Sequence, residues 1–217
     1  MSKHFKVVGL FSVLCLAVII SACGGPARAE EKSTEAVNMT RPSRIIIENF
    51  NGRVDITTDA VGKAAVEVTK FADINSRDSL QNIEFGMSQD SQTVIIRAQW
   101  PEGKASIGNA GADLKVHIPA DCIVQAAIGN GQITYRGGLN QGDYAFEVGN
   151  GTIELTLPPA SQFALNASVG NGGIHTDFPM AGATPNARVV TGKVGTDPAA
   201  SIAAFIGNGE INIRRGN

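Results

Sequence analysis

The stretch Ile128-Gly129-Asn130-Gly131-Gln132-Ile133 decides the fold, because three further copies of it follow along the chain. The copies are Val148-Gly149-Asn150-Gly151-Thr152-Ile153, Val169-Gly170-Asn171-Gly172-Gly173-Ile174 and Ile206-Gly207-Asn208-Gly209-Glu210-Ile211. The first three asparagines are 20 and 21 residues apart. A motif that recurs at a nearly fixed spacing predicts a repeat architecture, with one structural unit per copy.

The parity of the motif predicts a sharp corner in each copy. Side chains alternate between the two faces of a strand, so residues five apart, such as Ile128 and Ile133, should point to opposite sides. Both can reach one core only if the chain turns between them. Glycine adopts positive φ without penalty, and asparagine tolerates it better than most residues. We therefore expect the Gly-Asn-Gly triplets of all four copies to form structural corners.

Two weaker copies extend the series. Residues 189–194 have Thr191 in the asparagine position, and residues 107–112 keep Asn109 but lack the second glycine. If consecutive copies stack as consecutive coils, the asparagines should form a ladder of hydrogen-bonded amides that holds the corners together. A polar groove for a glycan along this ladder is the functional alternative.

The spacing of the copies predicts the fold class. About 20 residues at roughly 3.3 Å per residue give a circuit of about 60 Å, which fits a coil with two or three sides. We expect an all-β protein, a parallel β-solenoid with coils of about 20 residues. Residues 44–100 carry shorter period-two runs between turn signals, which predict an irregular N-terminal part rich in β-hairpins. One short helix is expected at 74–81, and a β-sandwich is the alternative fold.

Residues 1–22 predict a secretory signal, because Lys3 and Lys6 precede an apolar run that is short for a transmembrane helix. The run ends in Ile20-Ser21-Ala22-Cys23, which resembles the lipobox of bacterial lipoproteins. The resemblance implies cleavage before Cys23, diacylglycerol on its thiol and acylation of its amine, and hence lasting attachment to a membrane. Gly24, where an aspartate would resemble an inner-membrane retention signal, favours the outer membrane.

The remaining chain divides into a tether and a domain. Residues 24–43 are rich in Gly, Pro, Ala, Glu, Ser and Thr, so residues 23–43 are predicted to be a lipidated cysteine followed by a flexible tether. Residues 44–217 are enough for a single domain that buries about 70% of its unfolded surface. Cys122 alternates with apolar neighbours and is expected to be a buried small hydrophobe.

The charge balance excludes a nucleic-acid partner. The formal net charge is −2 at pH 7, and removing Lys3 and Lys6 with the signal leaves about −4. A nucleic-acid-binding chain would need a basic patch or stripe.

Two further segments carry a family resemblance. Asn51-Gly52-Arg53-Val54-Asp55-Ile56 and Val116-His117-Ile118-Pro119-Ala120, with the repeated Asn-Gly-x-Ile, resemble a family of bacterial envelope proteins described as adhesins of unknown function. The resemblance covers residues 44–217. It implies a right-handed, solenoid-like all-β domain, and it implies no catalytic residues.

Catalytic and metal-binding patterns are weak in the sequence. His117 and His175 each alternate with apolar neighbours, so outward-facing strand positions are expected rather than metal ligation. Calcium-binding β-rolls need a nine-residue period with aspartates in the turns, which this chain does not have. No cofactor motif is present. Four carboxylates are the loosest candidates for a sugar-cleaving pair: Glu147, Glu154, Asp177 and Glu210.

These observations predict a lipid-anchored, non-enzymatic interaction or scaffold module of the bacterial cell envelope. Its partners would be the membrane, through the lipid on Cys23, and an unidentified envelope polymer or protein. A carbohydrate-active enzyme and a purely structural spacer are the alternatives. Seven outward-facing polar residues are expected to form one flat face for many weak contacts: Gln125, Thr134, Thr152, Thr156, Asn166, Ser168 and Thr176.

Overall fold

The protein is nearly all β, as the sequence predicted. The computed structural model describes residues 28–38, 44–59, 63–90, 92–102, 109–181 and 188–216. They form an 11-stranded sheet and one short 3₁₀ helix, η1. The elements are β1 (Arg28–Asn38), β2 (Arg44–Asp59), β3 (Lys63–Asp73), η1 (Ile74–Asn82), β4 (Glu84–Asp90), β5 (Thr93–Gln99), β6 (Gly111–Pro119), β7 (Ile123–Arg136), β8 (Gly142–Leu157), β9 (Phe163–Thr176), β10 (Val189–Val194) and β11 (Ala200–Arg215).

Five long strands, β2, β7, β8, β9 and β11, each bend at an Asn-Gly pair. In β7 the side chains of Ile128 and Ile133 are both buried although they lie five residues apart, so the strand turns between them. Gly131 has a φ of 134°, which other residues rarely adopt. A Cβ at Gly131 would also overlap the carbonyl oxygen of Gly52 on the neighbouring strand. The corner therefore needs glycine both for its conformation and for close stacking.

We call the part of each bent strand before the corner its first arm and the part after it the second arm. The five strands lie in parallel and in register, so their corner asparagines align in the order Asn51, Asn130, Asn150, Asn208 and Asn171. Residues from both arms belong to one hydrophobic cluster. The two arms therefore enclose a single core between two layers.

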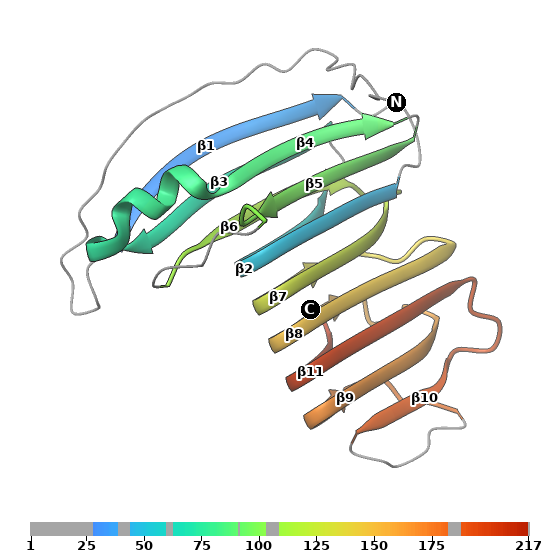
Figure 1. Ribbon diagram of the computed structural model, residues 1–217. Helices are drawn as coiled ribbons and strands as arrows, with labels where there is room; N and C mark the ends of the chain where they lie inside the picture. Colours follow the sequence, from blue (N-terminus) through green and yellow to red (C-terminus); the bar gives the residue numbers. More distant parts are fainter. Residues whose placement is uncertain are drawn as a thin grey trace, which may run out of the picture.

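The remaining strands extend the two layers separately. In the first-arm layer, β5 pairs with the start of β2, β4 pairs with β5, and β10 pairs with the start of β9. In the second-arm layer, β6 pairs with the end of β2, and β3 and β1 follow it. Figure 1 shows the resulting stack, with β1 at one end and β10 at the other. η1 lies at the β1 end and contacts β1 and β3.

Aromatic side chains fill the middle of the core. Tyr135 contacts both Tyr144 and Phe146, with ring centroids 6.2 and 5.6 Å apart. The Tyr135 hydroxyl donates a hydrogen bond to the carbonyl oxygen of Gly138 at 2.5 Å. Burial raises the pKa of Tyr135 well above its usual range, so the hydroxyl stays protonated and remains a donor.

The sheet is mixed and open, with mostly parallel strands. The structure therefore does not show the predicted parallel solenoid running through the whole chain. β1–β3, β3–β6, β4–β5 and β9–β10 are antiparallel pairs. The strand order also departs from the sequence order, because β11 lies between β8 and β9. Any two corner copies stack in the same register, so the motif fixes how strands pair but not which strands are neighbours.

Neither of the two weaker copies places its Asn or Thr in the row of corner asparagines. Thr191 lies in β10, which is straight and antiparallel to β9, opposite Asn166. Asn109 lies outside the strands, and its backbone N–H donates to Asp73. Residues 107–108 of that copy lie outside the described residues. Asn51, which the stacking prediction did not include, instead begins the row of aligned corner asparagines.

The N-terminal part differs from the predicted tether. Residues 28–38, within the segment expected to be flexible, form β1 and pair with β3 over the whole length of both strands. A polar strand can hold an edge position because the ladder of backbone hydrogen bonds, rather than side-chain burial, fixes it there. The short helix expected at 74–81 is η1, and β4 and β5 form an antiparallel hairpin.

Candidate functional site

The outer surface of the first-arm layer carries a straight row of side chains that crosses eight strands. Each residue of the row is the direct register partner of the next, and none is buried. We call it the central row: Gly86, Arg97, Glu48, Ala127, Glu147, Phe205, Ser168 and Val189. Seven strand spacings of about 4.8 Å give the row a length of roughly 34 Å.

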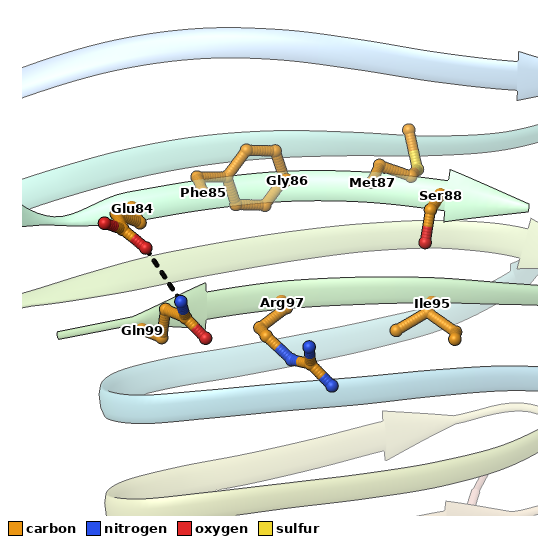
Figure 2. A pocket seen from close by; sticks show the side chains of 8 residues that line it. All are labelled: Glu84, Phe85, Gly86, Met87, Ser88, Ile95, Arg97 and Gln99. Carbon is orange, nitrogen blue, oxygen red and sulfur yellow. Dashed lines mark hydrogen bonds between the residues drawn. The ribbon is translucent and has the colours of Figure 1, made fainter. Parts of the chain in front are cut away.

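The first part of the row is a shallow hollow of about 290 Å³ over Gly86. Figure 2 shows Glu84 and Gln99 joined across β4 and β5 by a hydrogen bond of 2.7 Å, with Phe85 and Met87 extending from β4 away from Arg97. Gly86 leaves the hollow open, since a Cβ there would meet nothing within 4 Å.

Arg97 closes one side of this hollow and is bonded to β2. Its Nε donates to Glu48 at 2.5 Å, and this hydrogen bond raises the pKa of the guanidinium. The pair is exposed, so it contributes little to stability, but it neutralises the cation in place.

Two further hollows continue along the central row. A hollow of about 430 Å³ shares Arg97 and Gln99 with the first, and Ala127, Gly129 and Gly149 contribute to its lining. A third, of about 180 Å³, lies around Phe205 and is also lined by Ala145, Asn166, Ser168 and Ala203. Glu147 lines both the second and the third hollow. The three hollows therefore adjoin one another along the central row, and we call them together the groove.

Phe205 is the most unusual residue of this groove. It is 47% exposed, and Val189, which is 41% exposed, is the other large hydrophobic side chain found on the surface of the described residues. Both register partners of Phe205 are polar, Glu147 on β8 and Ser168 on β9. The aromatic ring therefore stands on an otherwise small and polar floor.

Phe205 was not identified from the sequence, although the alternation of buried residues around it predicts that it faces outward. Ile202, Ala204 and Ile206 are buried and alternate along β11, so the residue between the last two must face outward.

The corner asparagines form a hydrogen-bonded ladder at the line where the two layers meet. Asn150 donates to Asn130 at 2.8 Å, Asn208 donates to Asn150 at 2.7 Å, and Asn171 donates to Asn208 at 2.8 Å. The amides thus satisfy one another along the stack. Asn51 departs from this pattern, since its amide donates to the carbonyl oxygen of Ala110 at 2.7 Å.

The outer surface of the second-arm layer is charged, and some of its charges are paired. Lys115 lies 3.7 Å from Glu67, and Arg28 lies 2.8 Å from Asp113. Arg28 also stacks over the Phe71 ring at 3.5 Å. A hollow of about 680 Å³ on this side is lined by Arg28, Asp113 and Lys115, among others. Ionic groups that already have partners offer less to a ligand than unpaired ones.

The seven residues predicted to form one face do not lie together. Gln125, Asn166 and Ser168 precede their corners and belong to the first-arm surface, whereas Thr152 and Thr156 follow a corner and belong to the second-arm surface. Thr134 is buried there, and Thr176 lies opposite the buried Ile213. Because the two arms of each bent strand lie in different layers, the seven residues are divided between two surfaces.

The other candidate residues do not converge on one centre. Glu147 lies on the first-arm surface, and Glu154 and Glu210 lie on the second-arm surface. Asp177 accepts a hydrogen bond from the backbone of Arg215.

The two histidines lie on different strands, and His117 is 3.6 Å from Asp59. Within the described ranges, no group of three or more metal-ligating side chains is found. Cys122 is buried and forms no disulfide. Cys23 lies outside the described residues.

The fold is similar to that of a solved bacterial protein described as a "putative cell adhesion protein", from Clostridium sporogenes, with 14% identity, a TM-score of 0.57, and coverage of 86% of this chain and 100% of that chain. A "putative adhesin" from Bacteroides fragilis has 9% identity, a TM-score of 0.29, and coverage of 84% and 97%. Another from Parabacteroides merdae has 12% identity, a TM-score of 0.31, and coverage of 84% and 80%.

The similarity to the Clostridium protein shows a shared fold, and at this identity it shows no more than that. No protein-family model and no curated protein sequence matches the chain.

Proposed function

We propose that the protein is a lipid-anchored envelope protein that acts as a non-enzymatic, adhesin-like interaction module. The single observation that carries this proposal is the groove along the central row, in which the first and second hollows share Arg97 and Gln99 and the second and third share Glu147. A long, shallow and open groove suits an extended partner held by many weak contacts. The fold likeness to a solved protein described as a cell adhesion protein supports the same role.

The anchor in this proposal is the lipid on Cys23, with the outer membrane as the favoured site because Gly24 follows. Within the described part of the chain, no helix is long and apolar enough to cross a membrane. β1 begins at Arg28, five residues after Cys23, and five extended residues reach at most about 17 Å. The β1 end of the sheet would therefore be held close to the bilayer.

One observation favours an enzyme as the second candidate. Thr152 pairs with Glu210 and Glu154 pairs with Asn212, so Glu154 and Glu210 are diagonal neighbours on the second-arm surface. The Cα atoms of diagonal neighbours lie about 7–8 Å apart. Side chains at this spacing can place their carboxyl groups at the separation of about 6.5–9.5 Å that inverting glycosidases use. Glu210 is exposed, however, and a catalytic acid usually needs a less hydrated site.

The structural spacer is the weaker alternative. A spacer needs a surface without apolar features, and Phe205 and Val189 are exposed in one row on the first-arm surface. Exposed large apolar residues gathered in one place usually mark an interaction site.

The proposal is tested with the full-length protein purified in detergent. Retention on purified peptidoglycan, on lipopolysaccharide and on envelope extracts should be measured alongside analysis of the same polymers for cleavage products. Retention without products is expected. Products that disappear in Glu154→Gln or Glu210→Gln would establish the enzyme instead. Cys23→Ala should move the protein out of the detergent phase, and unchanged partitioning would contradict the lipid anchor.

A further inference from the structure

We propose that the groove along the central row binds an extended polysaccharide of neutral or amino sugars, with one sugar ring stacked on Phe205. This inference rests on the proposed function and names the site and the ligand class for it.

The chemistry around Phe205 fits a sugar ring. A pyranose has an apolar face of C–H groups, which packs on an aromatic ring, and an edge of hydroxyl groups that donate and accept hydrogen bonds. Phe205 offers the aromatic surface, and its register partners Glu147 and Ser168 lie one strand spacing away on either side. Asn166 lines the same hollow and adds an amide that both donates and accepts.

The small floor of the groove lets a flat ligand approach. Ala145 and Ala203, which line the hollow beside Phe205, are direct register partners on β8 and β11. Neither side chain extends far above the sheet, so a ring stacked on Phe205 can also reach Glu147 and Asn166. In the adjoining hollow, Gly129 and Gly149 keep the floor similarly low.

The charge of the row excludes an anionic polymer. Its one cation, Arg97, is already bonded to Glu48, whereas Glu147 has no ion-pair partner within the described residues. The net charge of the row is therefore negative. A polymer of phosphates or uronic acids would be repelled, whereas neutral hydroxyls, acetamides or amines would be accepted.

The length of the row favours a polymer over a folded protein. A stable protein interface usually buries about 800 Å² per partner around an apolar centre. Phe205 and Val189 are the large hydrophobic side chains exposed in the described residues, and Ser168 lies between them in the row. An extended chain lying across the strands can instead follow the row for roughly 34 Å, one strand spacing at a time.

The test uses the full-length protein in detergent and oligomers of N-acetylglucosamine of increasing length. Glucose oligomers serve as a second neutral ligand, and polygalacturonate serves as the anionic comparison. Affinity for the neutral oligomers should rise with length until the chain spans the row, and polygalacturonate should bind at least tenfold more weakly. Phe205→Ala should lower the affinity at least tenfold, and Glu147→Gln should lower it less.

Lys115→Ala on the second-arm surface is the matched control, and it should leave the affinity unchanged. Phe205 is exposed, so its replacement should leave the thermal transition in place, which excludes misfolding as the cause. Equal affinity of Phe205→Ala and the unsubstituted protein, or tighter binding of polygalacturonate, would overturn the site while leaving the interaction module standing. If the protein retained no polymer and no envelope protein, both proposals would fail. Retention of a folded envelope protein alone, unaffected by Phe205→Ala, would overturn only the sugar ligand.

Discussion

The two outer surfaces of this protein have the same construction and different chemistry. The central row crosses eight strands of the first-arm layer and carries an aromatic residue, an aliphatic residue, three small residues and three charged residues. A row of equal length crosses the second-arm layer, and we call it the charged row. Its members are Thr34, Glu67, Lys115, Asp55, Thr134, Glu154, Asn212 and His175.

The difference shows which positions the repeated motif controls. The residues of both rows alternate with the core-facing residues of their strands, although Thr134 and Asn212 of the charged row are buried. The corner motif specifies only the corner and its inward-facing neighbours. Outward positions on both sides of a corner are free to differ. In the charged row, Glu67 and Lys115 pair with each other at 3.7 Å, whereas in the central row Glu147 and Phe205 face solvent. The central row differs in its exposed aromatic side chain, which suits that surface to a ligand.

The largest expected effect comes from breaking the corner that both surfaces share. Gly131→Ala combines a positive φ of 134° with an overlap between the new Cβ and the carbonyl oxygen of Gly52. We expect the free energy of unfolding to fall by about 3 kcal/mol or more, because the neighbouring backbone must move as well. Urea denaturation of the purified protein measures this change.

Gly86→Ala is the matched control for the corner. Gly86 lies on the edge strand β4, and a Cβ there would meet nothing within 4 Å. The substitution should be neutral, or stabilising by less than about 1 kcal/mol. Equal losses for the two variants would contradict the stacked corner.

The corner was predictable from the sequence, but the order of the strands was not. Residues five apart that must both be buried, as Ile128 and Ile133 are, require a turn, and glycine with asparagine supplies it. The same motif in every copy makes all pairings equivalent, so nothing in it places Asn208 between Asn150 and Asn171.

The groove and the N-terminal strand β1 were harder to predict from the sequence. The outward parity of Phe205 can be read from its neighbours, but the groove depends on register partners from eight strands, which requires the strand order. The polar sequence of β1 is typical of a tether. Among the described side chains of β1, Ala29 is the buried hydrophobic one. Pairing with β3 through the backbone leaves no pattern in the side chains.

A smaller effect is expected from interrupting the asparagine ladder. Asn150→Ala removes two side-chain hydrogen bonds, one donated to Asn130 and one accepted from Asn208. These exposed bonds should together contribute about 1–2 kcal/mol to the free energy of unfolding. Asn166→Ala, exposed on the first-arm surface, should change it by less than about 0.5 kcal/mol. If the two substitutions had equal effects in urea denaturation, the ladder would not stabilise the corner.

Lys115→Ala tests the charged row directly. Lys115→Ala removes the pair with Glu67, whose side chains are 65% and 55% exposed. Exposed ion pairs contribute about 0.2–1 kcal/mol, so the loss should be small and should diminish further at high salt. Retention on neutral polysaccharide should not change. Weaker retention would place the ligand on the second-arm surface and reverse the contrast between the two rows.

The smallest effect should come from Glu35, at the β1 end of the second-arm layer. Glu35 is the register partner of the buried Val66, and its Oε2 is buried without a hydrogen-bond partner in the described residues. Burial raises the pKa of this carboxyl above its usual 4.5, and Lys70 partly offsets the rise. The folded state therefore holds the proton more tightly than the unfolded state, so stability increases as the pH falls through the raised pKa toward 4.5. Glu35→Gln should flatten this dependence in urea denaturation across that range, whereas Glu210→Gln, at an exposed position, should preserve it. A profile for Glu35→Gln that parallels the unsubstituted protein would mean that the carboxyl is solvated, and that β1 does not close this end of the layer.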